Sequence, residues 1–204
     1  LWAFPKWHRR ALGGKDKTAV KTSAFFNKYL FTKLNEFAKF LPEYSLTLEA
    51  THHGPYIDTP CCFIEIGSTE EEWQDTRAVK VVAETIKSAV ESFSFEKSEK
   101  ELISAIGLGG PHYCPNFNKI QLNSEYALSH IIPGYAFPLT NEIIKEAILK
   151  TIERTEIFIL DWKGLGKAEE RNRYLELLNA LGFKAIRSSD VAKWEIKIFI
   201  NNTF

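Results

Sequence analysis

Four of the five histidines lie close to the ends of segments that resemble β-strands, because their residues alternate between apolar and polar or are continuously apolar. They are His52 and His53 in the segment 51–55, His112 in the segment 109–115, and His130 just before Ile131. Imidazole nitrogens and carboxylate oxygens are the ligands that zinc favours outside thiolate sites. A catalytic zinc lowers the pKa of its bound water to about 7, so that this water can attack an ester or amide. These residues therefore predict a hydrolase-like pocket, with its metal dependence left open.

Glu65 and two glycines add to this pocket. Glu65 falls inside the apolar run 61–66, where an unpaired carboxylate would be costly, so we expect a metal, a histidine or a buried arginine beside it. Gly109 and Gly110 allow close approach of the backbone, and their N–H groups could stabilise an oxyanion. Each histidine could instead be a hydrogen-bonded structural residue. The sequence has no HExxH motif, nucleophile elbow, Walker motif or dinucleotide fingerprint.

The elements that must position these residues alternate between strand and helix. Apolar residues at helical spacing, or helix-start signals, predict helices over 19–40, 68–93, 141–152 and 167–181. Apolar runs or alternating residues predict strands over 44–50, 61–66, 102–108, 157–160, 184–187 and 194–200. This order predicts a single α/β domain, a mixed sheet with helices on both faces. In such sheets ligands bind outside the carboxyl ends of the strands, which is where the histidines fall.

The composition is that of an ordinary globular protein. The 204 residues hold 26 Lys+Arg against 26 Asp+Glu, with 45% hydrophobic residues, which excludes a polycationic coat protein and a disordered chain. No apolar run approaches the roughly 18 residues of a membrane span. Three cysteines without a CxxC pair or a secretory signal indicate a reducing compartment. We therefore expect a cytoplasmic protein without a membrane or DNA partner, and a monomer.

Positive charge gathers at the start of the chain, among aromatic residues. The basic side chains there include Lys6, Arg9, Arg10, Lys15 and Lys17. Such a stretch could meet a phosphate backbone or be a solvated face. The chain also begins at Leu1 and contains no Met, so we expect the sequence to lack part of an N-terminal region of the single domain 1–204.

Three ordered motifs resemble those of the archaeal and plant type of D-aminoacyl-tRNA deacylase. They are Thr51-His-His-Gly-Pro, then Phe63-Ile-Glu-Ile-Gly-Ser with Glu71-Glu-Trp, then Gly109-Gly-Pro-His-Tyr-Cys-Pro. The segments Gly13-Gly-Lys and Asp161-Trp-Lys-Gly are also similar to the family. The resemblance runs from about Gly13 to Arg187, whereas the family's earlier Arg-His motif and a further histidine motif have no counterpart here.

The resemblance implies a fold akin to phosphorylases and peptidyl-tRNA hydrolases, and zinc-dependent hydrolysis of the ester between a D-amino acid and the tRNA 3′ end. It makes His52, His112 and His130 candidate zinc ligands. It makes Glu65, His53, Gly109 and Gly110 candidate catalytic groups, without separating metal ligands from acid–base residues. The basic N-terminal stretch would bind the tRNA acceptor end. The alternatives are a metal-dependent small-molecule amidohydrolase or peptidase, and a tRNA-binding module without catalysis.

Overall fold

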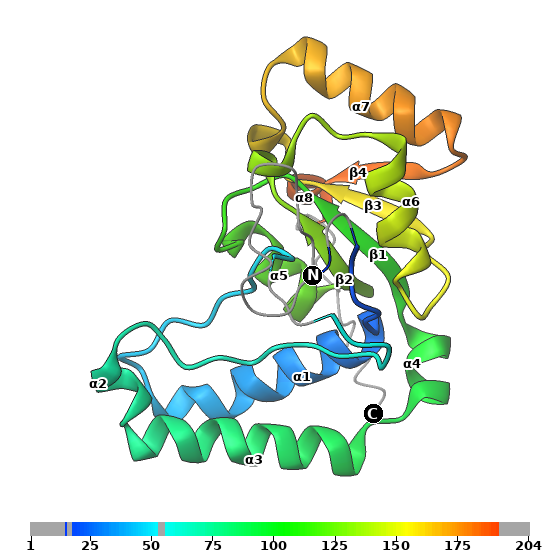
Figure 1. Ribbon diagram of the computed structural model, residues 1–204. Helices are drawn as coiled ribbons and strands as arrows, with labels where there is room; N and C mark the ends of the chain where they lie inside the picture. Colours follow the sequence, from blue (N-terminus) through cyan, green and yellow to red (C-terminus); the bar gives the residue numbers. More distant parts are fainter. Residues whose placement is uncertain (1–14, 16–17, 53–55, 192–204) are drawn as a thin grey trace, which may run out of the picture.

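A four-stranded parallel sheet forms the centre of the protein (Figure 1). The computed structural model describes residues 15, 18–52 and 56–191. The strands are β1 (Ile103–Leu108), β2 (Tyr126–Ile132), β3 (Ile157–Leu160) and β4 (Lys184–Arg187), in the order β2-β1-β3-β4. Their register aligns Leu108 with Leu160 and Leu160 with Arg187, so the carboxyl ends of three strands lie side by side.

Helices cover both faces of the sheet (Figure 1). On one face, α6 (Asn141–Leu149) and α7 (Ala168–Ala180) pack against alternate residues of β1 and β3, such as Ile106 and Phe158. On the other, α5 (Pro115–Asn123) and α8 (Ser188–Val191) pack against Ala105 and Ile159. The α/β fold with helices on both faces is confirmed.

The pairings between these strands are all parallel. Within the described residues, antiparallel pairing is limited to one isolated bridge, Glu49 with Tyr113. We predicted a mixed sheet with parallel and antiparallel pairs, and this bridge is the antiparallel part of it in the described residues. Because parallel strands buried on both faces have continuously apolar sequences, the sequence located β1 and β3 well, and it also located the more exposed edge strand β4.

The first long helix begins later than predicted. Helix α1 spans Ala24–Phe37 and is followed by a 3₁₀ turn, η1, over Ala38–Phe40. Ser23 caps it by accepting a hydrogen bond from the Phe26 N–H, and the buried Glu153 carboxylate accepts the N–H groups of Ala24 and Phe25 at 2.8 and 3.2 Å. Helix α1 begins at Ala24 because Ser23 and Glu153 satisfy its first N–H groups there.

The helix predicted over 68–93 is two helices. Helix α2 spans Glu70–Trp73, and α3 spans Thr76–Ser92. Asp75 starts α3 by accepting a hydrogen bond from the Arg77 N–H, which divides the continuous acidic and apolar pattern. Helix α3 packs along α1, away from the sheet (Figure 1).

Two predicted strands are absent from the described sheet. Residues 44–50 and 61–66 are extended segments without a regular ladder. Segment 44–50 hydrogen-bonds mainly to the β1–α5 region, as in the bonds from the Cys114 N–H to Leu48 O and from the Leu48 N–H to the Asn118 side chain. The alternating or apolar pattern thus predicted an extended backbone, but it did not predict the strand-pairing partner, which depends on tertiary contacts.

The remaining elements differ in length from the prediction or were not predicted. Helix α6 ends at Leu149 rather than 152, and α7 lies within the predicted 167–181. The sequence did not predict α4 (Phe95–Glu101), α5, β2, α8 or the 3₁₀ turns η2 (Gly134–Ala136) and η3 (Trp162–Leu165). The strand predicted over 194–200 lies outside the described residues. None of the described helices has the length and apolarity that crossing a membrane requires.

Candidate functional site

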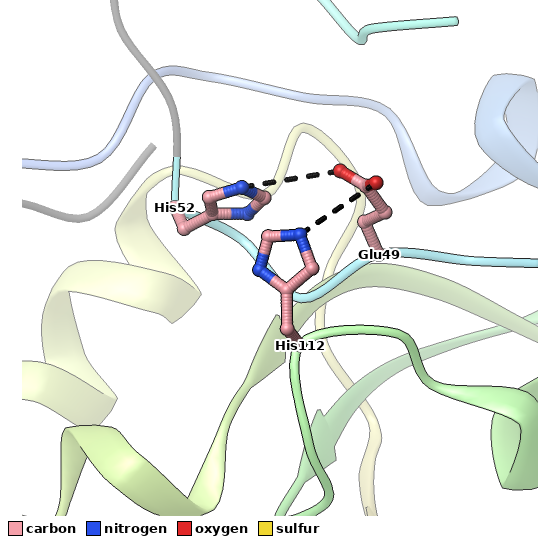
Figure 2. Close-up of side chains that lie close together, drawn as sticks. All are labelled: Glu49, His52 and His112. Carbon is pink, nitrogen blue, oxygen red and sulfur yellow. Dashed lines mark ion pairs between the residues drawn. The ribbon is translucent and has the colours of Figure 1, made fainter. Parts of the chain in front are cut away.

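A carboxylate and two imidazoles converge at the carboxyl edge of the sheet (Figure 2). The Nε2 atom of His52 lies 3.9 Å from Oε2 of Glu49, and Nε2 of His112 lies 3.7 Å from Oε1 of the same carboxylate. The two imidazole rings meet edge to face, with their centroids 4.2 Å apart. All three residues are half-buried, and the Nε2 atom of His52 is itself buried.

Backbone hydrogen bonds bring these residues together from distant parts of the chain. The Ala50 N–H donates to His112 O at 2.8 Å, and the Thr51 N–H donates to Ile131 O at 2.9 Å. The segment before His52 is thereby fastened both to the loop after β1 and to the end of β2. Consequently Glu49 and His52, three residues apart, face His112.

The His52 ring is oriented by a second contact. Its Nδ1 atom hydrogen-bonds to Ala50 O, and because a carbonyl can only accept, Nδ1 carries the proton. In the neutral ring Nε2 is then the basic nitrogen, and it points toward Glu49. Zinc-binding histidines commonly show this arrangement, in which the outer nitrogen donates to a carbonyl or carboxylate.

The three side chains fit a zinc ion. One ligand atom from each lies within 4.8 Å of the other two. Tetrahedral zinc with bonds of about 2.1 Å needs ligand atoms about 3.4 Å apart, so a small contraction of the cluster is sufficient. Two histidines and one glutamate also match a known catalytic ligand set, in which the fourth position is left for water.

Sequence reasoning missed Glu49. In the alternating run 44–50 it occupied the face opposite Leu48 and Ala50, which is typical of a solvated strand residue. The available signal was its position three residues before His52, in the segment that leads into the histidine motif.

His130, a predicted zinc ligand, lies in a different environment. It is 2% exposed, and its Nδ1 and Nε2 atoms lie 3.4 Å from Thr51 Oγ1 and 3.3 Å from Lys150 O. Burial lowers its pKa from 6.5 to about 3, so the ring is neutral at physiological pH. Its contact with Thr51, directly before His52, makes it a support for the cluster in the structure described.

Glu65 is exposed, and the buried-strand environment predicted for it is wrong, because residues 61–66 form no strand within the described sheet. Its side chain lines the same groove as the cluster. Two thiols in the area are poor nucleophiles, since burial raises the pKa of Cys114 to about 12 and that of Cys62 to about 11.

Gly109 and Gly110 form the turn after β1, both at positive φ, a conformation that favours glycine. The Gly109 N–H donates to Ile132 O at 2.8 Å and so belongs to the sheet edge. The Gly110 carbonyl accepts from the Gly134 N–H, and a Cβ on Gly164 would lie 2.2 Å from the Gly110 nitrogen. These glycines allow three loops to pack closely beneath the cluster.

Of the predicted tRNA-binding residues, Lys15 alone falls within the described ranges. It is exposed, and its Nζ lies 5.2 Å from the centroid of the Tyr56 ring, with Lys150 Nζ at 5.5 Å from the same ring. Lys6, Arg9, Arg10, Lys17 and the catalytic candidate His53 lie outside the described residues.

The cluster opens into a large groove of about 1540 Å³. One wall is apolar and comes from α1, with Leu30, Phe31 and Leu34. The lining also includes Glu49, His52 and His112 of the cluster and the exposed Glu65. The groove is larger than a typical small-molecule site of 300–1,000 Å³, and it combines a polar end with an apolar wall.

Fold and site thus define an α/β protein with an imidazole–carboxylate centre at the carboxyl edge of a parallel sheet. Residues 5–186 match the family model described as D-aminoacyl-tRNA deacylase. The chain belongs to the D-aminoacyl-tRNA deacylase family, which confirms the resemblance seen in its motifs.

Archaeal relatives and a solved structure agree with this assignment. The D-aminoacyl-tRNA deacylase of Thermococcus kodakarensis is 39% identical and that of Pyrococcus furiosus 38%, each over 89% of this chain and 64% of the relative. The chain therefore spans slightly less than two thirds of these relatives. A crystal structure of a conserved protein of unknown function superposes with a TM-score of 0.78 at 32% identity, over 90% of this chain and 63% of that one.

Proposed function

We propose that this chain hydrolyses the ester of D-aminoacyl-tRNA, releasing the D-amino acid and tRNA, with zinc as cofactor. The observation that carries the proposal is the Glu49–His52–His112 cluster at the polar end of the groove. Its support comes from family membership and from relatives that are named D-aminoacyl-tRNA deacylases. We further propose that the protein acts in the cytoplasm as a monomer.

Glu49, His52 and His112 would hold the zinc. Bound zinc would supply a water of lowered pKa and polarise the ester carbonyl. The proton on His52 Nδ1, fixed by Ala50 O, keeps Nε2 available as a ligand. Glu49 contributes negative charge, which favours retention of the divalent ion in a half-buried site.

Other residues would bind substrate and move protons. Glu65 lines the same groove as the cluster and is exposed, so its carboxylate can accept a proton from an attacking water. The apolar wall formed by Leu30, Phe31 and Leu34 suits the side chain of a tyrosyl or other large D-amino acid. Lys15 and Lys150 beside Tyr56 suit the terminal nucleotide, whose base could stack on the ring.

Release of tyrosine from D-Tyr-tRNA and L-Tyr-tRNA tests the proposal. We expect the protein to release D-tyrosine faster than L-tyrosine, and to lose this activity after exhaustive chelation and recover it with zinc. Hydrolysis that survives chelation would contradict the proposed zinc cofactor but not the proposed reaction. Failure to hydrolyse D-Tyr-tRNA with zinc present, together with turnover of free esters or peptides, would favour the small-molecule hydrolase.

A further inference from the structure

Two arginines stack on one tryptophan at the carboxyl ends of β3 and β4. Trp162 lies in η3, directly after β3; Arg187 ends β4 and Arg171 lies in α7. The guanidinium carbon of Arg187 lies 4.0 Å from the centroid of the Trp162 ring, and that of Arg171 lies 5.2 Å from it. We call these three residues the Arg–Trp–Arg stack.

Within the described residues, the acidic side chains form no ion pair with this stack. Among the ion pairs formed by the described residues, none involves Arg171 or Arg187, and Nε of Arg171 is buried without a hydrogen-bond partner in that part of the chain. The closest acid along α7, Glu170, accepts the Lys167 N–H at 2.8 Å and so caps its own helix. Two like charges near one ring repel each other, and a bound anion would relieve that repulsion.

The stack lies on the same edge of the sheet as the zinc-site candidates. The register aligns Arg187 with Leu160, and Leu160 with Leu108, which precedes the loop to His112. Neighbouring strands are about 4.8 Å apart, so the end of β4, which carries Arg187, lies about 10 Å across the sheet from the end of β1. The exposed charged side chains around it are Lys163 and Lys167 and, at the start of α7, Glu169 and Glu170.

We propose that the Arg–Trp–Arg stack binds phosphates of the tRNA acceptor arm while the ester lies at the Glu49–His52–His112 cluster. This inference rests on the proposed function. The ester is carried by the 3′-terminal ribose, so the phosphates of the preceding nucleotides lie on one side of the site, one and two steps away. Arginine suits this task because its planar guanidinium binds phosphate in a bidentate manner and can remain stacked on an aromatic ring.

The test is the salt dependence of tRNA binding by the full chain. The double variant R171Q/R187Q should bind deacylated tRNA at least about tenfold more weakly at low salt. It should also reduce the slope of log K against log salt by about 2, because each lost phosphate contact lowers the slope by about 1. The variant R171K/R187K keeps both charges and should retain most of the slope.

The matched control is R173Q/K184Q. It removes two exposed positive charges, one on α7 two residues beyond Arg171 and one at the first residue of β4, at the opposite edge of the sheet. Its affinity and slope should stay close to those of the unmodified chain. Thermal unfolding of every variant identifies any loss of fold. If R171Q/R187Q does not fold, R171K/R187K still tests whether binding depends on the guanidinium groups, because it keeps both charges.

Two results would overturn the proposal. One is an unchanged slope in R171Q/R187Q, and the other is an equal loss in R173Q/K184Q, which would indicate non-specific charge. Both can occur while the unmodified chain still hydrolyses D-Tyr-tRNA, so they leave the proposed function standing. Absence of that hydrolysis in the unmodified chain is a separate result, which contradicts the proposed function.

Discussion

His52 and His112 differ sharply from His130, although all three lie near the same edge of the sheet. The first two are half-buried and turn Nε2 toward Glu49. His130 is almost fully buried, and both of its ring nitrogens meet groups of the protein itself. The same residue type therefore serves two purposes, and the difference lies in exposure and in the presence of a carboxylate. Four predictions can break or sharpen this comparison.

The largest effect is expected at the cluster. His112→Ala or His52→Ala should lower D-Tyr-tRNA hydrolysis more than about 100-fold, because each removes a side chain that is proposed to bind the zinc directly. Hydrolysis and bound zinc, measured on the same preparations, should fall together. His130→Gln is the matched control. If hydrolysis and bound zinc decreased as much in His130→Gln as in His112→Ala, the distinction between His130 and the cluster histidines would be wrong.

A smaller loss is expected at Glu65. Glu65→Gln should lower kcat between about 10-fold and 100-fold while zinc remains bound, because the carboxylate is proposed to accept a proton and lies outside the cluster. Glu71→Gln, an exposed carboxylate lining the same groove, is the control. Equal activity of the two variants would exclude the proton-accepting role of Glu65.

The stability of the protein should depend on the protonation of His130. Its folded-state pKa, about 3, lies below the unfolded value of 6.5, so the unfolded chain alone binds this proton between those values. Stability from this residue is thus complete above pH 6.5 and is lost as the pH falls toward 3. At pH 4.5 the loss is about 3 kcal/mol.

Denaturant unfolding at pH 7 and pH 4.5 measures this loss. The free energy of unfolding of His130→Gln should change less between the two pH values than that of the unmodified chain, since Gln does not titrate. Equal changes in both proteins would show that His130 is not buried in its neutral form.

The smallest effect is expected at Cys114. Burial raises the pKa of this thiol to about 12, so almost no thiolate exists at neutral pH. Cys114→Ala should leave kcat within about twofold, although the lost packing of a buried side chain lowers stability by about 1 kcal/mol. A kcat reduced more than tenfold in folded protein would place the thiol in the reaction.

The sequence predicted those parts of the fold that depend on local pattern. Strands β1 and β3 were predicted from short apolar runs, and the histidine loops were predicted to lie at strand ends, as the topology requires. Residues 61–66 show the opposite case: the same kind of run forms no strand, because within the described residues no strand pairs with it. That error also placed Glu65 in a buried environment.

The site was predicted in part for a similar reason. The motifs identified His52 and His112 but could not separate them from His130, because burial is set by α6, β2 and the segment 50–52 together. Glu49 was missed because alternation made it a solvent-facing residue of a strand. The antiparallel bridge from Glu49 to Tyr113, together with the hydrogen bond from the Ala50 N–H to His112 O, brings this carboxylate to the two imidazoles.

Cobalt binding to the unmodified chain, Glu49→Gln and His130→Gln tests the central claim most directly. Cobalt occupies zinc sites and absorbs visible light, and its binding can be followed without any measurement of hydrolysis. We predict one tightly bound ion in the unmodified chain and in His130→Gln, and affinity reduced more than about 100-fold in Glu49→Gln. Equal binding by Glu49→Gln, or loss of binding in folded His130→Gln, would contradict the assignment of the metal to Glu49, His52 and His112.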